Sequence, residues 1–275
     1  MTRIRTKPTL NPAYLAHILH SLWRDGYFLN LCNKWVGQAA VNGKTLSTVL
    51  IPLPPLEIQR QIVDEIEVCQ RVINGARQVV EAWKPNLEVE LEEERKSAGV
   101  DTWDVVKLGD VCDVKTGKLN SNAATENGQY PFFTCSKDVF RIDTFAFDCE
   151  AILLSGNNAS GDFDVKHYKG KFNAYQRTYV ITIKEEFLDS LDYQIVKNTL
   201  ENNLASLKGK SIGGLTKYLT LGMITSIEVP KPPLEIQRAI VERIESERRA
   251  VEGCQGLIAV YEGKIQKIVG RMWEG

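Results

Sequence analysis

The fold is decided by the stretch PPLEIQR at residues 54–60, which recurs letter for letter at residues 232–238. The match extends outward in one register, since Pro52 corresponds to Pro230 and the apolar residues that follow also agree at an offset of 178 residues. Proline is tolerated in the first turn of a helix, so each double proline predicts a helix start. The repeat therefore predicts two related helices that lie far apart in the chain.

After each start, apolar residues alternate steps of three and four, which is the spacing of a coiled-coil seam. The predicted seam consists of Ile62, Ile66, Ile73 and Val80 in the first helix and Ile240, Ile244, Val251, Ile258 and Ile265 in the second. Two helices with matching seams should pack on each other. Pro85 interrupts the first pattern and predicts a break near Lys84. The acidic run at 87–96 is typical of a solvated helix face.

Between the two helices the sequence changes to short β-rich runs such as YPFFTC, AILLS and TYVITI, separated by Gly, Asn and Asp. A helix is predicted at about 185–207 from apolar residues three and four apart. Residues 1–51 look like the tail of a second domain of this kind, with Tyr14 placed before its long helix as Tyr193 is before the other. We therefore expect residues 1–51 to form only the back part of such a domain.

These patterns predict an α+β fold, in which mixed α/β domains are joined by long helices that pack as an antiparallel coiled coil. The predicted boundaries are 1–51 for the remnant of a first domain, 52–97 for the first long helix, 98–229 for a complete domain and 230–275 for the second long helix.

Composition limits the partners that the chain can have. Its 275 residues carry 34 Lys and Arg against 35 Asp and Glu, so any surface that binds anions must be local. The six cysteines form no C-x-x-C pair, and the start MTRIRTKPTL lacks the apolar core of a signal peptide. No apolar run approaches the roughly 20 residues that span a bilayer. We predict a cytoplasmic protein with no membrane partner.

Four short motifs imitate enzyme or metal sites without the residues that the chemistry needs. NPAY at 11–14 resembles a methyltransferase loop, but the chain has no G-x-G-x-G for the cofactor, and a helix start is favoured. Residues 209–211 (GKS) lack the earlier glycine of a phosphate loop, and 113–115 (DVK) lack the partner acid of a nuclease. His17 and His20 have no further ligands nearby in the sequence. We predict no catalytic residue and no metal site.

A polar stretch within residues 98–229 is the main candidate for DNA contacts. From 166 to 177 the chain carries cations and planar amides with no acidic residue, namely Lys166, Lys169, Lys171, Asn173, Tyr175, Gln176 and Arg177. Cations suit phosphates, and amide or guanidinium groups suit base edges. Gln176 and Arg177 are the candidates for base reading, although Arg177 could instead anchor its strand through an ion pair. Further candidates are Lys115, Lys118, Asn157, Asn158, Lys208, Lys210 and Ser211, the last three near flexible glycines.

Together with the two helix starts, WDVVKLGDVCDVKTGK at 103–118 and GKFNAYQRTYVI at 170–181 resemble the specificity subunits of type I restriction-modification systems. The resemblance implies a non-catalytic subunit whose two target-recognition domains each read half of a split site in double-stranded DNA. It implies that the helical pair sets the spacer and docks methylation subunits, and that a restriction subunit joins through the complex. S-adenosylmethionine would then bind the methylation subunits, with no cofactor on this chain.

The chain departs from that plan because its first recognition domain is confined to residues 1–51. It could pair with a second copy of itself, be completed by a second specificity chain, or be a decayed remnant. It could also be an assembly or decoy protein that binds methylation subunits without productive recognition, or serve a related combined restriction-methylation enzyme. A helix without its sheet predicts exposed apolar surface around Leu15, Ile18, Leu19 and Trp23.

Overall fold

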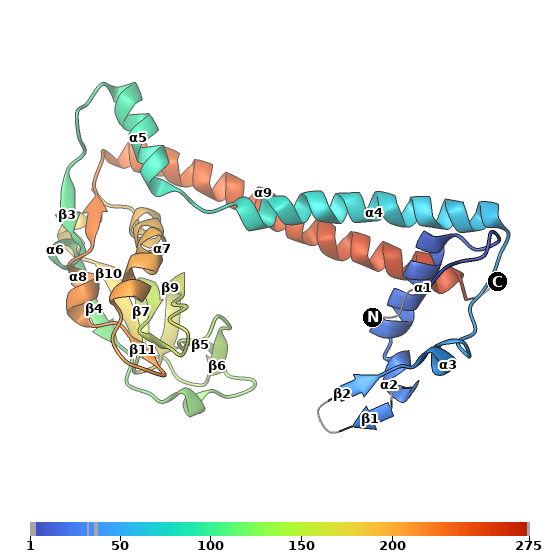
Figure 1. The fold of residues 1–275 in the computed structure, drawn as a ribbon. Helices are drawn as coiled ribbons and strands as arrows, with labels where there is room; N and C mark the ends of the chain where they lie inside the picture. Colours follow the sequence, from blue (N-terminus) through green and yellow to red (C-terminus); the bar gives the residue numbers. More distant parts are fainter. Residues whose placement is uncertain (1–3, 32, 36–37, 274–275) are drawn as a thin grey trace. The chain divides into compact units, whose positions relative to one another are not determined.

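The computed structural model describes residues 4–31, 33–35 and 38–273 of the chain. It confirms the α+β class and divides into two compact units, one of residues 1–83 with 249–275 and the other of residues 84–248. Figure 1 shows the elements of both units on one ribbon.

The first unit is mainly helical over its described residues. Its elements are α1 (Pro12–Arg24), α2 (Tyr27–Leu31), β1 (Asn33–Trp35), β2 (Gln38–Ala40), α3 (Gly43–Leu46), α4 (Leu56–Ala82) and residues 249–271 of α9 (Leu234–Arg271). Asn11 caps α1 by accepting hydrogen bonds from the backbone of Ala13 and Tyr14, and Pro12 follows in the first turn. The NPAY motif is therefore a helix start.

In the first unit, α4 and the last part of α9 pack as an antiparallel pair (Figure 1). Glu65 near the start of α4 pairs with Arg271 at 2.6 Å, and Arg77 near its end pairs with Glu262 at 3.3 Å. An apolar cluster fills the space between them, built from Ile66 and Cys69 on α4, from Ile268 and Val269 on α9, and from Met272 just after α9. The antiparallel coiled coil predicted from the seams is thus present.

The predicted seam positions differ in their burial. Ile66, Ile73 and Val251 are buried, whereas Ile62, Val80, Ile258 and Ile265 are half-buried. On α4, Val63 is buried and the predicted Ile62 is not. Val63 lies four residues after the fully buried Gln59, so the two side chains share the inward face of the helix. Ile240 and Ile244 are fully buried in the apolar cluster of the second unit.

The predicted helix break is also present. The first long helix ends at Ala82, and Trp83 is extended, two residues before Pro85. A second helix, α5 (Leu87–Ala98), starts behind the cap Asn86. Its acidic face is not simply solvated, because Glu90 and Glu94 form ion pairs with Arg243 at 2.5 and 2.8 Å.

The second unit is a mixed α/β domain. After α5 come β3 (Val105–Lys107), α6 (Leu108–Val111), β4 (Cys112–Thr116), the 3-10 turn η1 (Ser121–Ala123), β5 (Tyr130–Phe133), β6 (Phe140–Ile142), β7 (Phe147–Ser155), β8 (Asn157–Asn158), β9 (Val165–Ala174), β10 (Thr178–Ile183), the 3-10 turn η2 (Glu185–Phe187), α7 (Tyr193–Lys210), β11 (Lys217–Tyr218), α8 (Leu221–Thr225), β12 (Glu228–Pro230) and residues 234–248 of α9. The predicted helix at 185–207 begins later, at Tyr193.

Six strands form one sheet in the order β4-β10-β7-β9-β5-β6, antiparallel except where β5 meets β9. Ile152 and Leu154 belong to an apolar cluster shared with α7, and their neighbours Ala151 and Leu153 belong to a cluster of aromatic residues. Because successive side chains point to opposite faces of a strand, both faces of β7 are buried, which accounts for its continuous apolar run.

The two PPLEIQR copies build the same joint, one in each unit. Gln59 accepts a hydrogen bond from the backbone N–H of Asn11 and donates to the carbonyls of Thr9 and Pro54. Gln237 accepts from the N–H of Asp192 and donates to the carbonyls of Ser190 and Pro232. Both glutamines are fully buried. Each therefore ties the start of a shorter helix, α1 or α7, to the start of a long helix.

The joint corrects the predicted match between Tyr14 and Tyr193. Asn11 and Asp192 are the N-caps of α1 and α7, and each donates its N–H to the buried glutamine. Counted from these caps, Tyr14 corresponds to Ile195. The Tyr193 hydroxyl instead accepts a hydrogen bond from the backbone of Ile183.

Candidate nucleic-acid interface

The turn between β9 and β10, residues 175–177, carries the two side chains that the sequence selects for base reading. The turn closes through a hydrogen bond from the Thr178 N–H to the Tyr175 carbonyl, and the Gly156 N–H donates to the Arg177 carbonyl at 2.8 Å. A Cβ at Gly156 would overlap that carbonyl oxygen, so only glycine allows this approach. The turn is thereby fixed beside β8.

Arg177 is exposed, and its guanidinium lies over the ring of Tyr218, 5.7 Å from the centroid. Tyr218 lies on β11, which pairs with β8 through Tyr218 and Asn157. A cation–π contact of this kind attracts the guanidinium to the ring face and uses none of its N–H groups as hydrogen-bond donors. The alternative, an ion pair that anchors the strand, is not among the salt bridges of the described residues.

Gln176 is linked to the segment that follows β4. Its backbone N–H donates to the Leu119 carbonyl at 2.9 Å, and its side-chain amide donates to Asn120 at 2.8 Å. Lys118, next to Leu119, is exposed. The structure therefore brings Lys118 and Gln176, predicted separately, to one place.

The third part of this surface comes from β8 and the end of α7. The Asn158 side chain accepts hydrogen bonds from Ser160 and Asp162, so it organises its own loop. Lys208 pairs with Asp162 at 2.6 Å, and the hydrogen bonds from Lys208 and Ser160 hold the pKa of that carboxyl below its usual range. The side chains of Lys208 and Lys217 both lie close to Gly161, since a Cβ there would be 3.1 Å from Lys208 Cγ and 3.5 Å from Lys217 Cγ.

Lys210 is exposed in the last turn of α7, and Ser211 caps that turn by donating to the Lys208 carbonyl. We call the whole region the Arg177 surface; it consists of Lys118, Asn120, Asn157, Asn158, Gln176, Arg177, Lys208, Lys210, Ser211, Lys217 and Tyr218.

The lysines of β9 lie in a different setting. Lys166 forms an ion pair with Asp164 and donates to the Ser136 carbonyl at 2.8 Å. Lys169 pairs with Glu150 at 2.9 Å. Burial raises the pKa of Glu150, but the hydrogen bonds from Lys169 and His167 outweigh it, so the pKa is lowered. The charges of Lys166 and Lys169 are therefore offset within the domain.

The remaining candidates on this part of the domain are also placed by their neighbours. The Lys171 ammonium lies 4.7 Å from the ring centroid of Phe145. Lys115 is exposed on β4 and shares a hollow with Lys169 and Glu150. Asn173 is buried, and its amide bonds to the backbone of Ala174 and Thr144, so its side chain is not offered at the surface. Tyr175 is half-buried beside Leu119.

Sequence reasoning missed Lys217 and Tyr218. Their short strand β11 lies in GGLTKYLT, where glycines make a loop the natural expectation. An aromatic residue next to a lysine in such a loop was the available signal, because this combination suits contact with bases and phosphates.

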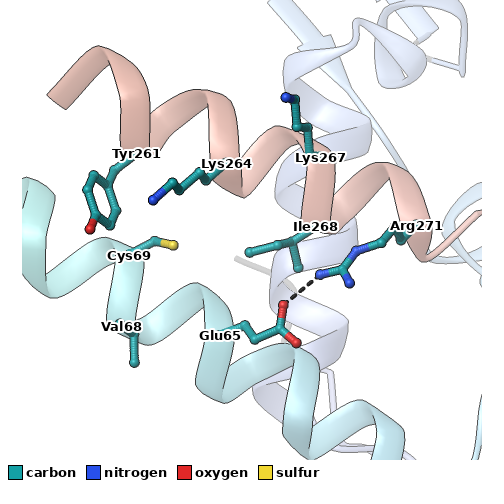
Figure 2. A pocket seen from close by; sticks show the side chains of 8 residues that line it. All are labelled: Glu65, Val68, Cys69, Tyr261, Lys264, Lys267, Ile268 and Arg271. Atoms are coloured by element: carbon teal, nitrogen blue, oxygen red, sulfur yellow. Dashed lines mark hydrogen bonds and ion pairs between the residues drawn. The ribbon is translucent and has the colours of Figure 1, made fainter. Parts of the chain in front are cut away.

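The first unit has a groove on its helix pair, with a volume of about 500 Å³. Figure 2 shows its lining side chains, with Cys69 and Ile268 pointing toward one another between the two helices and a dashed line joining Glu65 to Arg271. Val68 is half exposed, and the ammonium of Lys264 lies over the ring of Tyr261 at 4.2 Å. The groove thus has an apolar floor and a mainly basic rim.

Within residues 4–31, 33–35 and 38–273, no group of three or more His, Cys, Asp or Glu side chains is placed to hold a metal ion. None of the helices in these ranges combines the length and the apolar content needed to cross a membrane.

Comparison with known proteins gives a consistent result. The family described as "Type I restriction modification DNA specificity domain" matches residues 1–82 and 100–255. The type I restriction enzyme EcoDI specificity subunit of Escherichia coli is 43% identical over 156 residues, which are 56% of this chain and 33% of that protein. The putative type I restriction enzyme MjaX specificity subunit of Methanocaldococcus jannaschii is 24% identical over 271 residues, 87% of this chain and 62% of that protein. The chain therefore spans less than two thirds of the length of either relative.

Two solved structures share the fold. The crystal structure of the type I restriction-modification system S subunit from M. genitalium has a TM-score of 0.63 at 14% identity, covering 96% of this chain and 73% of that one. A structure described as the basis of complex assembly and conformational transition of the type I R-M system has a TM-score of 0.56 at 21% identity, covering 98% of this chain and 73% of that one. At these identities the likeness shows the fold alone.

Proposed function

This chain belongs to the family of type I restriction-modification specificity subunits, and from that premise we propose that its second unit reads one half of a split DNA site. The observation that carries the proposal is the Arg177 surface. On consecutive residues of a tight turn it carries a guanidinium held over an aromatic ring and an amide, with lysines on the neighbouring segments. This is the arrangement that reading of base edges, with phosphate contacts around it, requires.

Within this surface we assign two roles. Arg177 and Gln176 are proposed to read bases, because a guanidinium pairs bidentately with guanine and an amide with adenine. Lys118, Lys210 and Lys217 are proposed to contact phosphates, which position the domain but carry no sequence information. Lys166 and Lys169 are weaker candidates for phosphate contacts than their spacing predicts, since each already has an acidic partner.

We further propose that a methylation subunit docks on the groove of the helix pair shown in Figure 2. An apolar floor with a charged rim is the usual anatomy of a protein interface. Its basic residues, Lys264, Lys267 and Arg271, favour an acidic partner surface. A restriction subunit would join through the methylation subunits. In this scheme the chain is non-catalytic and cytoplasmic, and S-adenosylmethionine binds the methylation subunits.

The deciding experiment is a map of methylated adenines in the host genome, with the gene intact, deleted, or carrying Arg177→Ala. We expect a split motif to disappear on deletion and one base position to become degenerate in the variant. Arg249→Ala, which removes an exposed arginine of α9, is the matched control and should leave the motif unchanged. A map that is identical in the intact and deleted strains would overturn the proposal.

The two roles are distinguished by measuring the affinity of the purified complex for DNA fragments that contain the mapped motif and for random DNA. Loss of a bidentate base contact should weaken cognate binding by about 1–3 kcal/mol and leave random DNA unaffected. Lys210→Ala should weaken binding to all sequences alike and lower the slope of affinity against salt by about 1. Equal losses on cognate and random DNA for both variants would contradict the assignment of Arg177.

A further inference from the structure

A pocket of about 300 Å³ lies in the first unit between α1, α4 and the last part of α9. This volume is at the lower end of the range for small-molecule pockets. We call it the His17 pocket, and its basic lining residues come from two helices: His17, His20 and Arg24 from α1, and Arg77 from α4. The described residues that complete the lining are Ile66, Gln70, Ile73, Glu262 and Ile265.

The basic groups of the pocket are only weakly engaged with other parts of the chain. Arg24 is exposed and takes part in no ion pair among the described residues. Arg77 pairs with Glu262 at 3.3 Å, but both side chains are about half exposed, and exposed ion pairs are weak. The imidazole of His20 stacks on Trp23, a contact that uses the ring face and neither ring nitrogen.

The surroundings of His17 also favour a further negative charge. Its side chain is half-buried, and burial lowers its pKa most. The charge of Glu67 opposes this change and the charge of His20 adds to it, so that the pKa is lowered overall. An anion in the pocket would favour the protonated imidazole and reduce the repulsion between the basic groups.

In the second unit, an anion that belongs to the chain occupies the matching place. Counted from the N-caps of α1 and α7, His20 corresponds to Glu201. Counted from the two buried glutamines, Gln70 corresponds to Arg248. The Glu201 carboxylate pairs with Arg248 at 3.0 Å and with Lys197 at 3.1 Å. This place on the long helix therefore receives a carboxylate from the shorter helix in the second unit and an imidazole in the first.

We propose that the His17 pocket binds a phosphate group. Two guanidinium groups and two imidazoles from different helices offer N–H donors to several oxygens of a tetrahedral anion, whereas one arginine already suffices for a carboxylate. The phosphate of a free nucleotide and that of a DNA backbone present the same chemistry to these donors. The inference does not rest on the proposed reading of bases, because Gln176 and Arg177 belong to the other unit.

The test follows the imidazole signals of the full chain by NMR while inorganic phosphate is added at fixed pH and ionic strength. The chain has three histidines, and His167 serves as the internal reference, since it lies in the second unit between Glu150 and Gln194. We expect saturable shifts for His17 and His20 and none for His167. Chloride at the same ionic strength should shift none of the three.

Arginine variants connect these shifts to the pocket. Arg24→Gln and Arg77→Gln should each weaken phosphate binding about tenfold, as expected for the loss of one charge-assisted hydrogen bond. Arg71→Gln removes an exposed arginine of α4 that does not line the pocket, so it is the matched control and should leave the affinity unchanged. Amide exchange along α1 shows whether each variant remains folded.

A DNA duplex of random sequence and a nucleoside monophosphate distinguish the two sources of the phosphate. Shifts of His17 and His20 with the duplex would support a backbone phosphate, and shifts with the nucleotide alone would support a small molecule. Three outcomes would overturn the inference: no saturable shift with phosphate, an equal response to acetate, which would indicate an acidic protein partner, or unchanged affinity in both arginine variants. Arg177→Ala should leave the phosphate response intact, so either proposal can fail without the other.

Discussion

Replacing Gln237 by leucine tests whether the repeated glutamine is the joint between α7 and α9. Leucine fills a similar volume but leaves the N–H of Asp192 and the carbonyls of Ser190 and Pro232 without their partner. A buried polar group left unpaired costs about 1–3 kcal/mol. Two of the three bonds are only partly buried, so water can reach their backbone groups. We therefore use the lower end of the range, about 1 kcal/mol for each of the three groups, and expect the free energy of unfolding to fall by about 3 kcal/mol.

The assay is urea unfolding of the full chain, followed by circular dichroism and by amide exchange in α7. Because Gln59 makes the same three bonds in the first unit, Gln59→Leu should cost a similar amount, with its exchange increase confined to α1. Gln255→Leu changes an exposed glutamine of α9 and serves as the control. If Gln237→Leu lost no more stability than Gln255→Leu, the hydrogen bonds would not hold the joint.

Three shorter predictions concern burial and close approach. Burial lowers the pKa of His17, so protonation favours the unfolded chain; stability should fall as pH drops below about 6.5, by less in His17→Gln, as urea titrations at pH 7.5 and 5.5 would show. Burial raises the pKa of Cys112 from the ordinary value of 9.0 to about 12. At pH 8 the fraction of Cys112 present as thiolate is therefore about a thousandfold lower than for a thiol with the ordinary pKa. Iodoacetamide should label Cys112 far more slowly than Cys254. A Cβ at Gly117 would overlap a backbone carbonyl at the end of β9, so Gly117→Ala should cost about 3 kcal/mol in a thermal melt, whereas Gly253→Ala, with open space around it, should be neutral or stabilising.

The long helices were predictable because their signals are local. The double prolines, the seam spacing and Pro85 each act within a few residues, and both helix starts and the break agree with them. The apolar runs likewise predicted β5, β7 and β10. The order of these strands was not predictable, because the pairing of β7 with both β9 and β10 depends on contacts between distant residues.

The sequence predicted the residues of the candidate site one by one. Which of them lie next to one another depends on the pairing between strands. Spacing alone favoured Lys166 and Lys169, since no acidic residue lies between 166 and 177. Their acidic partners lie outside that stretch. Asp164 comes just before it, and Glu150 is on the neighbouring strand β7. Tyr218 reaches Arg177 because β11 pairs with β8, a contact that no local pattern indicates.

The register of α1 shows why hydrogen-bond partners are a better guide to an internal repeat than distance along the chain. The distance to the prolines matched Tyr14 with Tyr193, and the absence of a covering sheet predicted exposed apolar surface around Leu15, Ile18, Leu19 and Trp23. The joint at Gln59 shows that the connection from the cap residue to the prolines is longer in the first copy, and Ile18 is fully buried against the long helices. Trp23 is exposed, as predicted. Leu15 and Leu19, which were also predicted as exposed, are half-buried, and counted from the caps they correspond to the fully buried Val196 and Leu200 of α7.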